Sequence, residues 1–318
     1  MRDDMTDHIN HMNGMIAQHT QTQKIQQITE VDLLLDAKVL LGEGPSWNES
    51  TQQLYWVDIE GCAVHVYDPS NGTDRRIDLG QMAGCVVPRR AGGVLLAMQH
   101  GFYTLDLETE ELRPILDPEV ELAENRFNDG KCDSRGRLWA GTTRISHDQP
   151  SGSLYCLDTD LTCQRRVADV WISNGLAWSA DDRIMYFIDS PTCRVDAFDF
   201  DVESGALSNR RTVVEVPAGT GTPDGMTIDE EGMLWIALWD GWRVTRWDPR
   251  SGHLIGEIPL PVARPTSCVF GGPDLDQLYI TTASTRLPAA SLADQPLAGG
   301  LFHCVPGVRG LPTHAFNG

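Results

Sequence analysis

Residues 129–140, DGKCDSRGRLWA, contain the pattern that decides the fold. A polar residue precedes a glycine, a turn follows, and a leucine then stands directly before an aromatic residue. Clear or weaker versions of this pattern begin at Gly44, Gly84, Gly130, Gly175, Gly225 and Ser267. Consecutive starts lie 40 to 50 residues apart, which is the length of one four-stranded propeller blade. The repeat therefore predicts an all-β chain folded as a six-bladed β-propeller.

The segments between the repeat starts have the composition of strands. Short runs of alternating apolar residues end at Gly, Asp, Pro or Asn, as in residues 54–61 (LYWVDIEG). A D-P-x-x-G turn, which begins at Asp68 and again at Asp248, joins two such runs tightly. No long stretch has helical periodicity. These features agree with a fold built from strands alone.

A propeller has to close its ring, because the end blades otherwise leave open strand edges. Residues 31–41 (VDLLLDAKVLL) precede the first repeat, and we expect them to complete the last blade beside residues 299–305 (GGLFHCV). Residues 1–30 are polar, rich in Gln and without periodicity. We therefore expect a flexible N-terminal extension over residues 1–30 and a single six-bladed propeller domain over residues 31–318.

The composition of the chain narrows its possible partners. The 318-residue chain has a formal net charge of −20, so it repels nucleic acids and anionic lipid surfaces. No apolar run approaches the roughly 18 residues of a membrane helix, and residues 1–30 lack the apolar core of a secretory signal. Eight cysteines occur without a C-x-x-C pair, several of them within apolar runs. These features favour reduced thiols and a cytoplasmic protein, and they leave the oligomeric state open.

The position just before each repeat start supplies the candidate site. The innermost strands of a propeller line its central channel, so equivalent positions converge on the axis. The residues at this position are Glu43, Ala83, Asp129, Asn174, Asp224 and Thr266. Carboxylates packed together repel one another unless a cation or a proton lies between them. The set therefore favours oxygen ligands for a divalent ion; the alternative is that Asp-Gly and Asn-Gly are ordinary turn residues.

Four segments resemble the regucalcin and gluconolactonase family, also known as the senescence marker protein family. They are LGEGPSW (residues 41–47), RFNDGKCDSRGRLWAGT (126–142), ISNGLAWS (172–179) and PDGMTID (223–229). The resemblance extends from residue 33 to residue 306, with its motifs in the order of the family. It implies a six-bladed propeller with one divalent metal ion in the channel.

The resemblance also implies roles for individual residues. It assigns metal binding to Glu43, Asn174 and Asp224, and substrate contact to Arg126 and Asn128 with Asp129 nearby. One departure concerns an acidic residue that some members have shortly after the Gly-Thr of the second motif. This chain has Ser146 near that place, a difference that bears on sugar recognition. The nine histidines are scattered along the chain, and none is assigned a role.

Together these expectations describe a hydrolase of a cyclic carboxylic ester, a sugar lactone such as gluconolactone, xylonolactone, arabinolactone or galactonolactone. The metal ion stabilises charge on the ester oxygen, and Asp224 serves as a ligand and as the general base. A site made of oxygen ligands admits Ca, Mg, Mn, Fe(II) or Zn. Two alternatives stay open at this stage. One is a hydrolase of other esters or phosphotriesters on the same fold, and the other is a non-catalytic calcium-binding propeller.

Overall fold

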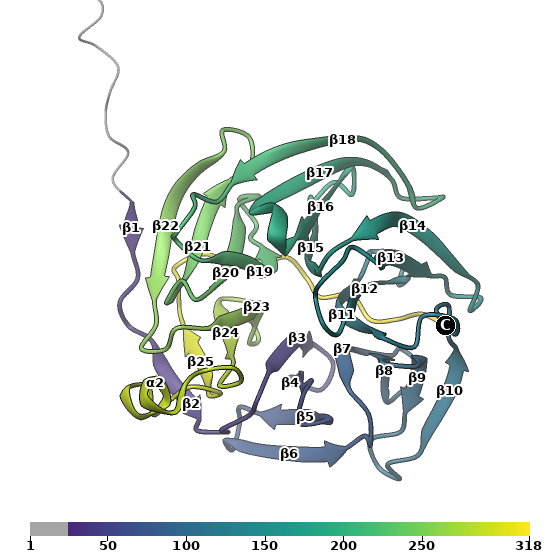
Figure 1. Ribbon diagram of the computed structural model, residues 1–318, viewed down its shortest axis with the longest axis horizontal. Coiled ribbons are helices and arrows are strands. Elements are labelled where there is room, and N and C mark those ends of the chain that lie inside the picture. Colours follow the sequence, from purple (N-terminus) through teal and green to yellow (C-terminus); the bar gives the residue numbers. More distant parts are fainter. Residues whose placement is uncertain (1–24) are drawn as a thin grey trace, which may run out of the picture.

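The six repeats fold as six antiparallel sheets, or blades, arranged in a ring around a central axis (Figure 1). The computed structural model describes residues 25–318. In every blade the strand that carries the repeat position lies innermost and contacts the innermost strands of both neighbouring blades. The prediction of an all-β, six-bladed propeller is confirmed.

The first three blades each consist of four consecutive strands. Blade 1 contains β3 (Gly42–Asn48), β4 (Gln53–Asp58), β5 (Ala63–Asp68) and β6 (Thr73–Asp78). Blade 2 contains β7 (Ala83–Pro88), β8 (Val94–Met98), β9 (Gly101–Leu105) and β10 (Leu112–Leu116). Blade 3 contains β11 (Asn125–Cys132), β12 (Leu138–Arg144), β13 (Gly152–Leu157) and β14 (Cys163–Val170).

The last three blades include the short helices. Blade 4 contains β15 (Ser173–Trp178), β16 (Ile184–Asp189), β17 (Arg194–Asp201) and β18 (Ala206–Glu215), with the 3₁₀ turn η1 (Ser190–Thr192) after β16. Blade 5 contains β19 (Thr222–Ile228), β20 (Leu234–Trp239), β21 (Arg243–Asp248) and β22 (His253–Pro259). Blade 6 contains β23 (Pro265–Gly271), β24 (Gln277–Thr282) and β25 (Leu301–Cys304), with helix α2 (Ala289–Asp294) between the last two.

The N-terminal part of the chain closes the ring. Strand β2 (Asp32–Leu35) pairs antiparallel with β25 as the outermost strand of blade 6, so the pairing expected for residues 31–41 is confirmed. Most of the extension expected over residues 1–30 lies outside the described residues. Within its last six residues, β1 (Gln26–Gln27) pairs parallel with β22 at the edge of blade 5, so strand pairing begins before residue 31.

Each innermost strand has an irregularity in its pairing at the repeat position. The register shifts between Glu43 and Ser46 in β3, and at the equivalent place in β7, β11, β15, β19 and β23. Such bulges redirect a side chain away from its regular alternation. The repeat glycine lets neighbouring strands approach, because a Cβ at Gly84 would overlap the carbonyl oxygen of Asn128 in the next blade. The repeated motif thus redirects the side chain at the repeat position of each blade, and this side chain is polar in every blade except blade 2, which has Ala83.

Apolar side chains between neighbouring blades form the core. Trp47, Trp56, Trp139 and Trp235 are almost completely buried there, and burying a large apolar side chain contributes about 1.5–3 kcal/mol. All eight cysteines are free, in agreement with the expected thiols. No helix within residues 25–318 is long and apolar enough to cross a membrane.

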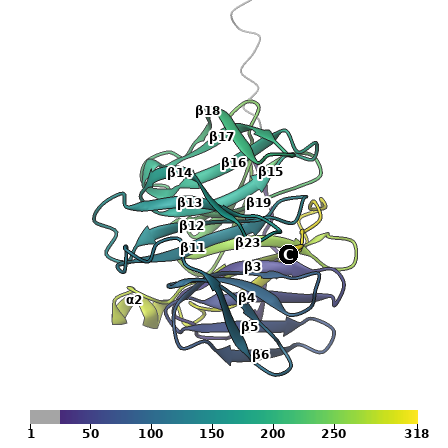
Figure 2. The same ribbon diagram turned by 90° about the vertical axis from the view of Figure 1, so that its right-hand side faces the viewer.

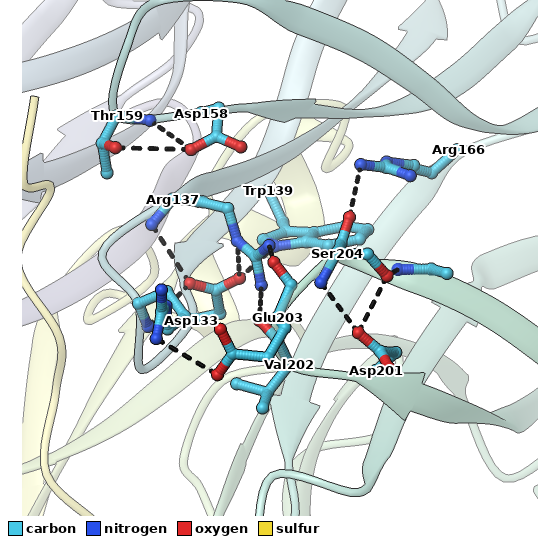
Figure 3. A network of polar contacts seen from close by, with 12 residues as sticks. Asp133, Arg137, Trp139, Asp158, Thr159, Arg166, Asp201, Val202, Glu203 and Ser204 are labelled. Atoms are coloured by element: carbon cyan, nitrogen blue, oxygen red, sulfur yellow. Dashed lines mark hydrogen bonds and ion pairs between the residues drawn. The ribbon is translucent and has the colours of Figure 1, made fainter.

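The turn between β11 and β12 encloses a buried carboxylate. Asp133 is fully buried and accepts hydrogen bonds from the Arg137 Nε at 2.7 Å and the Trp139 Nε1 at 2.8 Å, as well as from two backbone N–H groups (Figure 3). Blade 5 repeats the arrangement: Asp229, also fully buried, accepts from the Trp235 indole and the Arg246 guanidinium. Each of these buried carboxylates therefore has a cationic partner within the chain.

The two ends of the ring differ. Helix α2 lies at the end where the innermost strands begin, whereas the C-terminal segment runs across the opposite end (Figures 1 and 2). That segment bonds to blade 5 through Leu311 and to blade 2 through Phe316, whose side chain is fully buried. The end that carries α2 stays free of this segment, and it holds the candidate site.

Candidate functional site

A cavity of about 390 Å³ opens at the end of the ring where the innermost strands begin. Its lining residues come from the starts of innermost strands and from the ends of the second strands, or the segments after them, in blades 3 to 6. Of the residues predicted from sequence, the cavity is lined by Glu43, Arg126, Asn128, Asn174 and Asp224. The structure therefore brings together side chains from blades 1, 3, 4 and 5.

Two carboxyl groups face each other at this cavity. Glu43 and Asp224 are 4% and 7% exposed, and their carboxyl groups lie close enough for each to affect the pKa of the other. Burial, followed by the nearby charge of Asp129, raises the pKa of Glu43 to about 8. Burial and the charge of Glu43 raise the pKa of Asp224 well above its ordinary value. Two such groups cannot both ionise here unless a cation approaches them.

Asn174 is held beside this pair by the neighbouring blade. Its Nδ2 donates to the Ser190 Oγ at 2.8 Å, and Ser190 in turn donates to the carbonyl oxygen of Pro223 at 2.6 Å. Pro223 directly precedes Asp224, so this chain of bonds fixes Asn174 relative to β19. The Asn174 Oδ1 accepts one hydrogen bond, from the Asn128 Nδ2, and keeps a second lone pair that could bind a cation.

Arg126 and Asn128 form one connected unit with Asn174. The Arg126 Nη1 donates to the Asn128 Oδ1 at 2.6 Å and to the backbone oxygen of Phe127 at 2.9 Å. The Asn128 Nδ2 donates to the Asn174 Oδ1 and to the backbone oxygen of Ser173, both at 2.8 Å. Both amide protons of Asn128 are therefore engaged, which suits a side chain that orients Arg126 and Asn174.

Asp129 occupies a different place from the other predicted residues. It is 4% exposed and accepts from its neighbouring backbone N–H at Gly130, but it is not part of the cavity wall. Burial raises its pKa, and the charge of Lys131 opposes that rise. Its negative charge raises the pKa of both Glu43 and Asp224. Asp129 thus acts on the carboxyl pair through its charge.

The donor set fits a hard or borderline divalent cation. Two buried carboxylates and one oriented amide oxygen line the same cavity, and a cation there would offset the burial and the like charges that raise both carboxyl pKa values. No group of three His, Cys, Asp or Glu side chains within residues 25–318 forms a cluster that could hold a metal ion. The candidate set is of another kind, because its third donor is an amide.

Further residues of the cavity wall carried no sequence signal. Ser190, His147, Arg264 and Arg286 line it, and they come from loops or from η1, where residue types do not repeat between blades. The position at which some family members have an acidic residue does not contribute to the cavity wall in this chain. Ser146 is exposed and bonds to Arg144 and Asp148, while its neighbour His147 reaches the cavity.

The chain is similar to a family of known proteins over most of its length. The family model described as SMP-30/Gluconolactonase/LRE-like region matches residues 41–284. A Bacillus subtilis (strain 168) protein provisionally named sugar lactone lactonase YvrE is 40% identical over 267 residues, which are 84% of this chain and 91% of that protein. Regucalcin of Danio rerio is 40% identical over 292 residues, 91% of this chain and 99% of its own.

A solved structure shows the same architecture. It is that of a protein from Agrobacterium tumefaciens str. C58, described as a calcium-binding protein, regucalcin. It superposes with a TM-score of 0.88 and 26% identity, and the match covers 92% of this chain and 99% of that one.

Proposed function

The chain belongs to the SMP-30/gluconolactonase/LRE-like family, and from that membership we propose that it is a divalent-metal-dependent hydrolase that opens a sugar lactone to the sugar acid. The resemblance found in its motifs is confirmed. The name of the Bacillus subtilis relative, a sugar lactone lactonase, supports the reaction class. The regucalcin described as a calcium-binding protein supports a divalent ion and makes calcium the first metal to test.

One observation carries the proposal: two buried carboxyl groups face each other at a cavity that also holds a buried guanidinium. Glu43 and Asp224 repel each other when both are ionised, and folding alone gains nothing from that repulsion. Arg126 stands beside them, 5% exposed. A calcium store would not need Arg126, whereas an ester hydrolase needs hydrogen-bond donors near the reacting group.

The chemistry of a lactone fits these residues. The carbonyl oxygen of a cyclic ester gains negative charge when water attacks its carbon. A divalent cation held by Glu43, Asn174 and Asp224 would supply positive charge for that oxygen and lower the pKa of a water molecule. We assign to Asp224 the acceptance of a proton from the attacking water, because it is a carboxylate of the cavity wall beside the place proposed for the cation and its water.

Arg126 is assigned to the substrate. Burial lowers the pKa of its guanidinium to about 10, so the group still carries its charge at neutral pH. Within residues 25–318, its Nη1 makes the hydrogen bonds of this side chain, to Phe127 and Asn128, and its other N–H groups can donate to the oxygens of a sugar lactone. Asn128 orients Arg126 and Asn174 and reaches a substrate only through the free lone pair of its Oδ1.

The proposal is tested with a panel of lactones. Gluconolactone, xylonolactone, arabinolactone and galactonolactone are assayed with calcium, magnesium, manganese, iron(II) and zinc, above the rate of spontaneous hydrolysis. Aryl esters and phosphotriesters serve as the comparison. We expect metal-dependent turnover of at least one sugar lactone and little of the other esters. Preferred turnover of phosphotriesters, or no turnover with any metal, would contradict the proposal.

A further inference from the structure

A histidine that has no role assigned from the sequence also lines the cavity. His147 follows β12 in the loop between β12 and β13, and it lines the same cavity as Glu43, Arg126 and Asp224. It is partly buried. The site already described gives it no task, because neither the proposed cation nor the proposed base involves it.

The loop that carries His147 is held in place by its neighbours. The Arg144 side chain bonds to Glu124, to the Ser146 Oγ at 3.0 Å and to Asp148 at 3.0 Å. The His147 N–H donates to the backbone oxygen of Arg144 at 3.0 Å. These bonds fix a tight turn whose apex presents the imidazole to the cavity.

The turn places His147 in an unfavourable backbone conformation. Its φ is 53°, a region where a residue with a side chain costs on the order of 1 kcal/mol or more. Thirteen other non-glycine residues within residues 25–318 also have a positive φ. The conformation therefore shows how the turn is built, and a role for His147 is indicated by its place at the cavity and by its ring nitrogen.

The imidazole also has an unsatisfied polar atom. Within residues 25–318, the His147 Nε2 is buried and has no hydrogen-bond partner, and an unpaired buried polar group costs about 1–3 kcal/mol. Burial, together with the charges of Arg126 and Arg286, lowers the pKa of His147 to about 4. The ring is therefore neutral at physiological pH, with one nitrogen as a donor and the other as an acceptor.

We propose that His147 is a specificity-determining residue that recognises a hydroxyl group of the sugar lactone. A hydroxyl both donates and accepts, so it can pair with a ring nitrogen in either tautomer, after rotation of the ring where needed. This inference rests on the proposed function. His147 is adjacent to Ser146, near which some members of the family have an acidic residue.

The test compares His147→Ala and His147→Gln with wild type on gluconolactone and its epimer galactonolactone. His253→Ala is the matched control, because His253 is exposed in β22 and does not line the cavity. Loss of one hydrogen bond to substrate predicts a fall of about 10-fold in kcat/KM for the preferred lactone in His147→Ala. We expect the ratio between the two epimers to shrink, His147→Gln to recover part of it, and the metal content to stay unchanged.

The experiment distinguishes a failure of this inference from a failure of the proposed function. If wild type hydrolyses lactones but His147→Ala leaves kcat/KM and the epimer ratio unchanged, the role of His147 is contradicted while the proposed function stands. A wild type without turnover of any lactone would contradict the proposed function and this inference together. Loss of metal from His147→Ala would also overturn it, because the residue would then support the cation rather than the sugar.

Discussion

Two groups of buried carboxylates lie within the same ring, and their surroundings are opposite. Asp133 (Figure 3) and Asp229 each directly follow an innermost strand, and each is paired with an arginine and a tryptophan N–H. Glu43 and Asp224, at the cavity, face each other. The first pair is buried with complete partners supplied by the chain, and the second is buried with a like charge as its neighbour.

This difference distinguishes carboxylates that stabilise the fold from carboxylates that serve the chemistry of the site. A buried carboxylate that has its cation and its hydrogen bonds is part of the folded framework, and it costs stability mainly when one partner is removed. Carboxylates that oppose each other are kept because something outside the chain completes them. Exposure does not distinguish the groups, since all four residues are less than 9% exposed; only the identity of their neighbours does.

The largest effect is expected from Asp224. Asp224→Ala should lower kcat/KM on the preferred lactone by about 10³-fold or more, together with metal occupancy, because both the ligand and the base are removed. Asp224→Asn should retain part of the metal and still lose most of the rate, since the amide is not a base. Steady-state kinetics and metal analysis of the same samples check this. An Asp224→Asn variant close to wild type would mean that the proton goes elsewhere.

Asp133 should respond in the opposite way. Asp133→Ala leaves the Arg137 guanidinium buried without its partner, which costs about 3–5 kcal/mol of unfolding free energy, while any molecule that folds keeps its lactonase rate. Asp224→Ala should lose little stability in metal-free protein, because it removes a repulsion. Denaturant unfolding of both variants makes the comparison. Equal losses of stability would erase the distinction between the two groups.

Substitutions of Arg126 and Asn128 should lower activity by a smaller factor, and they should distinguish substrate contacts from metal ligands. Arg126→Ala removes charged donors to the substrate, so kcat/KM should fall about 10- to 100-fold with metal retained. Asn128→Ala should lower both kcat/KM and metal affinity, because Asn128 bonds to Arg126 and to Asn174. Isothermal titration with the metal and lactone kinetics measure the two quantities. Metal loss from Arg126→Ala would show that ligands and substrate contacts are not separate.

A different kind of effect is a dependence of stability on pH. In metal-free protein the pKa of Glu43 is raised from 4.5 to about 8, so between these values the folded chain binds more protons than the unfolded chain. The contribution of Glu43 is therefore full below pH 4.5 and is lost as pH rises through about 8. Unfolding experiments across this window should show a steeper decline for wild type than for Glu43→Gln. Matching pH profiles would mean that the carboxyl pair is not strained.

The sequence predicts the fold because the same physical need recurs in each blade. A bulge at the repeat position needs a glycine such as Gly84 where the next strand approaches. This requirement produces a sequence pattern that repeats with the blades. The same repeated pattern identifies Glu43, Asn174 and Asp224, because each precedes a bulge. Residues 31–41 are recognisable as a closing strand because they form an apolar run left over after six repeats.

The other residues of the site do not belong to a repeated sequence pattern. His147 and Arg286 come from loops after second strands, where each blade has its own sequence and length. The engagement of both Asn128 amide protons depends on contacts with blade 4, and no local pattern encodes a partner in another blade. Side-chain partners across blades therefore had to come from the structure.

The central claim is that the carboxyl pair is completed by one divalent cation that the reaction requires. The most direct test strips the protein with a chelator, verifies the metal content, and follows acid release from the preferred lactone as the metal is added back. We predict that activity disappears with the metal and returns in full at about one ion per chain, as expected for a single site. Full lactonase activity in a verified metal-free sample would contradict the claim.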